Sequence, residues 1–457
     1  MSHSLTRGLG RFVAAPGIDR VPEDIGPLIR QGFVDTLACL LAGRREPVTQ
    51  VAYQVAVRRA SAAQASTLLG AARLSTEDAA FVNAVAAHAL DYDDMALSGH
   101  PSVVLVPALL AAGEPLAISG AALLMAYLVG YEVWAELAAR EPDSLHAKGW
   151  HPTSVLGTVA AAAAVAHLER LAAAQSAHAL GIAASLASGL MGNFGSMTKP
   201  LHAGWAARQG IEAVRLAQAG ATASDDILES ATGFLAAFSP EGRADRADWT
   251  PPVEWRIRRA GLSIKKYPVC YASHRIIDGV IDLRHRHGIE PAAIRQISAT
   301  LSDINARVLH HHAPQTALQA KFSLEFACAM AASDGAVGLP QVTDEQVRRA
   351  DIQALMGKVR ARTVPAGCPV EPSFALHDGV EITLLDGTVF DSGPIRFARG
   401  HAQNPLTNEE LRGKFLGCAG PHEQDRAKRL LHSLEALGID DAAPLYPHLN
   451  ASEAHHA

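Results

Sequence analysis

The chain has 457 residues, of which 49% are hydrophobic, 19% charged and 5% aromatic, and its formal net charge is −6. A chain of this length and balance can bury a large core and is expected to form about two or three domains. The acidic balance, without any run of Lys and Arg, argues against a nucleic-acid surface. Five scattered cysteines without Cys-x-x-Cys spacing argue against a disulfide framework and against a zinc or iron–sulfur site.

The same features predict a cytoplasmic protein that does not cross a membrane. An odd number of dispersed cysteines suits a reducing compartment, and the first residues lack the apolar core of a signal peptide. The longest apolar stretch, Val155–Leu168, has 14 residues, is rich in alanine and contains a histidine. It is too short and too weakly apolar to span a bilayer, so we expect a buried helix there.

Helical patterns follow one another from Pro27 to about Ala221. Their expected starts are Pro27, Ser75, Ala121, Pro152 and Pro200. Proline suits the first turn of a helix, where its missing N–H would have no partner within the helix. The abundant alanine favours helices that pack closely, since it loses no side-chain entropy in a helix.

The pattern changes after about residue 250. Ile294–Leu301 and Val380–Leu384 alternate like strands, and Asp386-Gly387 predicts a hairpin turn into Thr388–Phe390. Capping boxes begin helices after Thr343 and after Thr407. The predicted fold is therefore mainly α, with an all-helical large domain and a smaller α+β domain. The helical domain comprises residues 1–258 and is completed by 404–457, the α+β domain comprises 262–400, and a polar tail from Asn450 is expected to be disordered.

Ionisable residues gather first in Asp91-Tyr92-Asp93-Asp94, followed by His100-Pro101-Ser102. The aspartates follow the helix that begins at Ser75. The negative end of its dipole and their mutual repulsion should raise a carboxyl pKa, so that one Asp becomes a proton carrier. The alternative is an acidic, solvated turn, which is common in loops.

Two further groups stand beside prolines that begin helices. His151 precedes Pro152, and the positive helix end should keep its imidazole neutral and able to act as a base. The alternative is a structural, capping histidine. Lys199 precedes Pro200, so that its pKa would be lowered or its charge aimed at a bound carboxylate.

The last group is Lys265-Lys266-Tyr267-Pro268-Val269-Cys270, with His274 after it. Adjacent lysines usually form a solvated surface, but the flanking Tyr267-Pro268 indicates a packed turn. Three consecutive histidines, His310–His312, cannot all face one ion from a regular element, so no metal site is predicted there. Cys270 is more typical of a small buried residue than of a nucleophile, and Gly192–Gly195 lacks the spacing of a phosphate loop.

Taken in order, these segments resemble the MmgE/PrpD family, which includes 2-methylcitrate dehydratase, cis-aconitate decarboxylase and iminodisuccinate epimerase. The likeness extends from Phe33-Val-Asp-Thr-Leu-Ala to Asn404-Pro-Leu-Thr-Asn-Glu-Glu-Leu. Its most specific parts are His88-Ala-Leu-Asp-Tyr-Asp-Asp94, Gly99-His-Pro-Ser102, His151-Pro-Thr-Ser154, Thr198-Lys-Pro-Leu-His202 and Lys265-Lys-Tyr-Pro-Val-Cys270.

The resemblance implies a helical domain, an α+β lid, a homodimer and an active site in the cleft between the domains. It implies chemistry without a metal or an organic cofactor, on a small polycarboxylate substrate. Carried over position by position, it assigns catalysis to Asp91, His100, His151, Lys199 and Lys265. It assigns substrate binding to Asp94, Ser102, Thr153, His202, Lys266, Tyr267 and His274.

The expected function is a cofactor-independent lyase, either a dehydratase or a decarboxylase, that transfers a proton at a carbon α to a carboxylate. Two departures from the family pattern favour an alternative. Met95 stands where dehydratases and decarboxylases have Thr, and Lys321-Phe-Ser-Leu-Glu-Phe326 has Phe where Tyr is common. An epimerase of a small dicarboxylate such as iminodisuccinate would use the same acids and bases without protonating a leaving group. A third reading is a protein that binds carboxylates without catalysis.

Overall fold

The computed structural model describes residues 4–59, 62–70, 72–439 and 445–449, so the tail from Asn450 lies outside the described residues. The chain divides into two compact units. The first contains Met1–Gly192, Thr198–Leu262 and Thr407–Ala457, and the second contains Asn193–Met197 and Ser263–Leu406. The predicted fold class is confirmed, because the first unit is helical and the second combines helices with one sheet.

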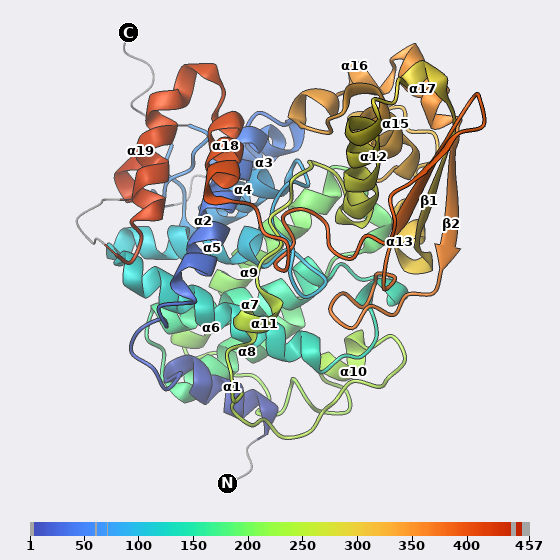
Figure 1. The fold of residues 1–457 in the computed structure, drawn as a ribbon. Helices are drawn as coiled ribbons and strands as arrows, with labels where there is room; N and C mark the ends of the chain where they lie inside the picture. Colours follow the sequence, from blue (N-terminus) through green and yellow to red (C-terminus); the bar gives the residue numbers. More distant parts are fainter. Residues whose placement is uncertain (1–3, 60–61, 71, 440–444, 450–457) are drawn as a thin grey trace. The chain divides into compact units, whose positions relative to one another are not determined.

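The described part of the first unit is built from α-helices (Figure 1). They are α1 (Leu5–Ala14), α2 (Gly26–Gly43), α3 (Pro47–Arg58), α4 (Thr76–His88), α5 (Pro101–Gly113), α6 (Gly120–Ala139), α7 (Pro152–Leu168), α8 (Ala173–Leu186), α9 (Thr198–Gln218), α10 (Phe234–Phe238), α11 (Arg256–Ala260), α18 (Asn408–Ala419) and α19 (Gln424–Glu435).

The centre of this unit is α7, which packs against α5, α6, α8 and α9. Small residues set the close spacing. A Cβ added to Gly130 on α6 would lie 2.8 Å from the Cβ of Ala164, and one added to Gly210 on α9 would lie 2.4 Å from that of Ala161. Such contacts are closer than side chains tolerate, so the alanine-rich composition does serve close helix packing.

The predicted helix starts agree with the structure except at α9. Pro27 lies in the first turn of α2, and Pro152 is the first residue of α7. The predicted start of α9 at Pro200 is wrong by two residues, because the helix begins at Thr198. Lys199 therefore lies inside the first helical turn, where the backbone N–H groups have no partner within the helix.

Among the described helices, only α6 is long and apolar enough to cross a membrane. However, 83% of its apolar segment is buried inside the protein. The predicted buried helix at Val155–Leu168 is confirmed, since every residue of α7 except His167 is buried. Both are core helices of the first unit.

The second unit contains a four-stranded sheet in the order β2-β1-β3-β4. Its strands are β1 (Ile294–Ser302), β2 (Val359–Val364), β3 (Gly379–Leu384) and β4 (Val389–Asp391). β1 runs parallel to β2 and antiparallel to β3, and β3 pairs with β4 in an antiparallel hairpin. Its helices are α12 (His274–His287), α13 (Asp303–Val308), α14 (Ala317–Ala320), α15 (Leu324–Asp334), α16 (Asp344–Val347) and α17 (Ala350–Met356).

The core of the second unit lies between the sheet and two helices, α12 and α15 (Figure 1). Buried residues of β1, such as Ile297 and Leu301, pack there with Ile276 of α12 and Phe326 of α15. The predicted strand at Ile294–Leu301 and the hairpin at Asp386-Gly387 are confirmed. The edge strand β2 was not predicted, because most of its residues are exposed and two are arginines, as suits a protected sheet edge.

Candidate active site

The acidic turn Asp91–Asp94 is buried in the first unit. α4 ends at His88, and Asp91 then takes a left-handed backbone conformation with φ of +53°, which few residues other than glycine adopt. The exposed fractions of Asp91, Asp93 and Asp94 are 3%, 0% and 0%. The alternative of a solvated turn is therefore wrong, and every carboxylate here needs a partner to offset its loss of water.

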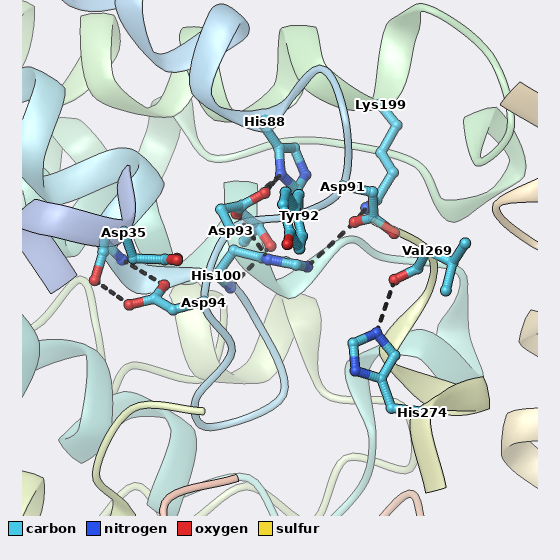
Figure 2. A network of polar contacts seen from close by, with 12 residues as sticks. Asp35, His88, Asp91, Tyr92, Asp93, Asp94, His100, Lys199, Val269 and His274 are labelled. Atoms are coloured by element: carbon cyan, nitrogen blue, oxygen red, sulfur yellow. Dashed lines mark hydrogen bonds and ion pairs between the residues drawn. The ribbon is translucent and has the colours of Figure 1, made fainter. Parts of the chain in front are cut away.

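Asp91 forms an ion pair with Lys199 from the first turn of α9. The Lys199 Nζ atom lies 2.5 Å from Asp91 Oδ1, and the His100 Nε2 atom lies 3.8 Å from the same oxygen (Figure 2). All three side chains are nearly inaccessible to solvent. Segments 108 residues apart in the chain thus bring a carboxylate, an ammonium and an imidazole together.

Asp93 bridges two imidazoles. Its Oδ1 lies 2.9 Å from His88 Nδ1, and its Oδ2 lies 2.8 Å from His100 Nδ1 (Figure 2). Burial alone would raise the pKa of Asp93, but the two neighbouring histidines hold that pKa well below its usual value. Asp93 is therefore not the carboxyl whose pKa is raised, because its imidazole partners outweigh the effect of burial.

Asp94 faces away from this group, into a second buried network. Its carboxylate accepts a hydrogen bond from the Ser102 hydroxyl, which lies 2.6 Å from the Tyr127 hydroxyl. Burial and the charge of Asp35 raise the pKa of Asp94 well above its usual value, so the predicted rise is confirmed here. The contacts of Asp94 and Ser102 are those of a structural network, and their predicted role in substrate binding stays a prediction.

His151 lies at the N-terminal cap of α7, as predicted, and pairs with His202 of α9. The two Nδ1 atoms are 3.1 Å apart, so one nitrogen must donate and the other accept. The pKa of His151 lies well below its usual value, mainly because of burial and then because of Lys199. The imidazole is neutral, as expected, but burial rather than the helix dipole is the main cause.

The loop between the acidic turn and α5 is tightly held. Ala96 and Gly99 exchange two backbone hydrogen bonds of 2.9 and 3.0 Å, and Leu97 and Ser98 between them both have positive φ. Side chains at such positions carry strain that the surroundings must stabilise. His100 follows, and its backbone N–H donates to the Thr153 hydroxyl at 3.2 Å. Thr153, a predicted substrate ligand, thus helps to hold His100.

The remaining predicted residues belong to the second unit. Lys265, Tyr267 and His274 are buried, whereas Lys266 is partly exposed. The Tyr267 hydroxyl donates to Asp278 at 2.6 Å. His274 Nε2 lies 3.2 Å from the Val269 carbonyl oxygen (Figure 2). The predicted packed turn is confirmed by these contacts, while the catalytic role of Lys265 and the binding roles of its neighbours stay predictions.

A metal ion is one possible occupant of the buried group. Among the described residues, one set of side chains has suitable spacing, with potential ligand atoms within 4.8 Å of one another: His88, Asp91, Asp93 and His100. However, Lys199 places an ammonium 2.5 Å from Asp91, and a cation bound beside it would be repelled. The arrangement suits the movement of protons better than the binding of a metal ion.

The sequence patterns assign no role to four residues that make buried polar contacts in this region: His88, Asp93, Asp35 and Lys414. His88 and Asp93 were noted only as parts of a motif. Asp35 lies in the middle of the apolar helix α2, and such a buried acid is a signal that it has a partner. That partner is Lys414, whose Nζ lies 2.6 Å from Asp35 Oδ1.

Comparisons with known proteins identify the family of the chain. The MmgE/PrpD N-terminal domain model matches residues 7–247, and the MmgE/PrpD C-terminal domain model matches residues 267–437. The chain is 32% identical over 390 residues to a cis-aconitate decarboxylase of Mus musculus, covering 82% of this chain and 78% of the relative. It is 31% identical over 438 residues to the cis-aconitate decarboxylase of Homo sapiens, covering 92% and 88%. A cis-aconitate decarboxylase of Aspergillus terreus is 26% identical over 464 residues, covering 94% and 93%. The chain therefore belongs to the MmgE/PrpD family, as an enzyme of the lyase type.

Proposed function

We propose that this lyase is a cofactor-independent decarboxylase of a small di- or tricarboxylic acid, with cis-aconitate as the first candidate. The observation that carries the proposal is the buried contact of Asp91 with Lys199, beside His100. The relatives named as cis-aconitate decarboxylases, which match along most of the chain, support the choice of substrate.

The charges of this group suit a substrate carboxylate. Lys199 is a compact cation that can pair with it, and burial strengthens such an interaction. A substrate carboxylate bound to Lys199 would compete with Asp91 for the ammonium. Once the cation is shared, the pKa of Asp91 rises, so that this carboxyl becomes able to carry the proton that the reaction needs.

The reaction needs one proton and no redox partner. In an unsaturated acid such as cis-aconitate, the bond between a CH₂ carbon and its carboxylate breaks, and carbon dioxide leaves. The released electron pair forms a new carbon–carbon double bond. The pair of the old double bond then takes a proton at the carbon α to another carboxylate. We assign this proton transfer to Asp91 or to the imidazoles of His100 and His151, because a nearby acid of suitable pKa lowers the barrier.

An epimerase is the second candidate. It is favoured by Met95, which directly follows Asp94 and offers neither a hydroxyl nor a charge. An epimerase removes a proton from one face of a carbon and returns one to the other, so it needs two acid–base groups but no acid for a leaving group. We assign these roles to His151, which caps the N-terminus of α7, and to Asp91, which follows α4.

Incubation in deuterated water distinguishes the candidates. Cis-aconitate, 2-methylcitrate and iminodisuccinate are supplied separately, and products are followed by proton NMR together with the release of carbon dioxide. We expect carbon dioxide to be lost from the unsaturated tricarboxylate, with one deuteron in each product molecule. Exchange with inversion, without loss of carbon dioxide or water, would overturn the decarboxylase and support the epimerase. Loss of water from 2-methylcitrate alone would make the enzyme a dehydratase.

A further inference from the structure

Asp93 is placed to control the protonation of two rings at once. It is completely buried, and each of its oxygens lies within hydrogen-bonding distance of an imidazole Nδ1 atom, His88 on one side and His100 on the other. An ionised carboxylate only accepts hydrogen bonds. The carboxylate therefore favours a proton on Nδ1 of both imidazoles: His88 Nδ1 is its hydrogen-bond partner at 2.9 Å, and His100 Nδ1 lies 2.8 Å from Oδ2.

A neutral imidazole has a single N–H, so a proton fixed at Nδ1 leaves Nε2 with a lone pair. For His88 this state is stable at neutral pH, because burial lowers its pKa to about 4. For His100 the consequence concerns the Asp91–Lys199 pair. His100 Nε2 faces Asp91 Oδ1 at 3.8 Å, the same oxygen that Lys199 contacts.

We infer that Asp93 is a positioning residue, which holds His100 so that its Nε2 atom exchanges a proton beside the Asp91–Lys199 pair. His100 lies between two carboxylates, Asp93 at Nδ1 and Asp91 at Nε2. His100 takes up a proton from solvent at Nε2, where the Asp91 carboxylate at 3.8 Å stabilises the positive charge, and it passes that proton to the substrate carbon, which returns the ring to its neutral Nδ1–H form. Asp93 itself stays ionised throughout. The assignment rests on the proposed function only in its last step, the delivery of the proton to substrate.

The local fold explains why Asp93 reaches both rings. The positive φ of Asp91 reverses the chain after α4, so Asp93 turns back to His88 in the last turn of that helix. His100 approaches from the other side as the residue before α5. The His88 ring packs edge-on against His100 at 4.6 Å and stacks on His151 at 5.9 Å between centroids. Asp93 therefore orients the rings of His88 and His100 directly, and the ring of His151 packs against one of them.

The wild-type enzyme gives the first test. Protein labelled with ¹⁵N-histidine is studied without substrate near pH 7 by long-range proton–nitrogen NMR, which distinguishes the two neutral tautomers. His88→Gln and His100→Gln assign the signals. We expect both rings as the Nδ1–H form, and a His100 ring that carries its proton on Nε2 would overturn the inference. This measurement needs no turnover, so it stands or falls independently of the proposed substrate.

The variant Asp93→Asn gives the second test. We expect it to lose the uniform Nδ1–H state of His88 and His100, and to lower kcat by roughly 10²-fold or more with little change in KM. The matched control is Asp78→Asn. Asp78 is a buried carboxylate on α4, the helix that ends at His88, and it pairs with Arg59 and Arg208 outside this group.

The control variant is expected to keep the wild-type tautomers and kcat, even if it is less stable. Asp93→Asn with unchanged tautomers, or with a kcat equal to that of Asp78→Asn, would overturn the positioning role. If Asp93→Asn does not fold, the wild-type spectrum still decides. Tautomers as expected in a protein that turns over none of the candidate acids would contradict the proposed function and leave the positioning role of Asp93 intact.

Discussion

Lys414, on a helix near the end of the chain, places its ammonium 2.7 Å from the carbonyl oxygen of Tyr92, in the middle of the acidic turn. The same ammonium lies 3.7 Å from the centre of the Tyr92 ring and contacts Asp35 on α2. Asp91 and Asp93 flank Tyr92 and point to Lys199 and to the histidines. Helix α18 thus stabilises the turn through the carbonyl and the ring of Tyr92, between the two carboxylates that contact the acid–base groups.

Removal of this ammonium should damage both stability and activity. Lys414→Met leaves Asp35 buried without its cation, and we expect the free energy of unfolding to fall by about 3–5 kcal/mol. Urea denaturation measures this loss. We also expect kcat to fall, because the carbonyl of Tyr92 loses its donor.

Arg412→Ala on the same helix is the control. It removes an ion pair with Glu435 in which the Arg412 side chain is 59% exposed, and exposed pairs contribute about 1 kcal/mol or less. Equal stability of the Lys414 and Arg412 variants would contradict an anchoring role for Lys414.

The ammonium of Lys199 is expected to matter for substrate directly. Lys199→Met should lower kcat/KM by roughly 10²- to 10³-fold, since a charge aimed at the reacting group is lost. Lys199→Arg should restore only part of the activity, because a planar guanidinium does not replace a compact ammonium in a packed site.

Lys428→Met provides the matched control for Lys199, because its side chain is 62% exposed on α19. It should leave steady-state kinetics unchanged. If Lys199→Met retained the kcat/KM of Lys428→Met, the proposed contact with a substrate carboxylate would be wrong.

Local sequence signals predicted much of this fold and site. Pro152 marked the start of α7, and so placed His151 at its N-terminus. The alternation in Val380–Leu384 predicted a strand, and its partner strand follows the turn that contains Asp386-Gly387. These features depend on neighbours in sequence, so a single chain contains enough information to find them.

Local sequence patterns do not reveal which distant residues and strands pair in the fold. Nothing near Lys414 indicates that it pairs with Asp35, and the exposed, charged residues of β2 resemble a loop until β1 lies beside them. The lowered pKa of Asp93 could not be predicted for the same reason. Its sequence neighbours are acids, whereas its spatial neighbours at Oδ1 and Oδ2 are imidazoles.

The buried histidines should make stability depend on pH. Burial lowers the pKa of His88 and of His202 to about 4 in the folded state, whereas an unfolded chain has a histidine pKa of about 6.5. Between these values the unfolded state binds more protons. The free energy of unfolding therefore falls as the pH drops from 6.5 towards 4, by up to about 1.4 kcal/mol per pH unit for each histidine.

Urea denaturation at pH 7, 6 and 5 checks this prediction. His202→Gln should reduce the number of protons taken up on unfolding, which the slope of unfolding free energy against pH reports, by about one. His432→Gln, at an exposed position of α19, should leave this slope close to that of the wild type. Equal pH dependence in His202→Gln and the wild type would mean that His202 is not held neutral by burial.

A methyl group at Gly99 should disturb His100 without removing any ionisable group. An added Cβ would lie 2.6 Å from the Trp134 ring and 3.1 Å from the Thr153 nitrogen. Trp134 is fully buried and cannot move aside. Gly99→Ala should therefore displace the loop and weaken the hydrogen bond from the His100 backbone N–H to the Thr153 hydroxyl. We expect it to lower the free energy of unfolding by about 1–3 kcal/mol.

The activity of Gly99→Ala then shows whether turnover depends on the position of the His100 ring as well as on its presence. Because His100 remains present but displaced, we expect kcat to fall more steeply than the stability loss explains at a temperature where the variant is fully folded. Gly413→Ala, on the exposed side of α18 with nothing within 4 Å of the added Cβ, should keep kcat and gain up to about 1 kcal/mol, since alanine favours a helix. Wild-type kcat in folded Gly99→Ala would mean that the precise position of His100 is not needed for turnover.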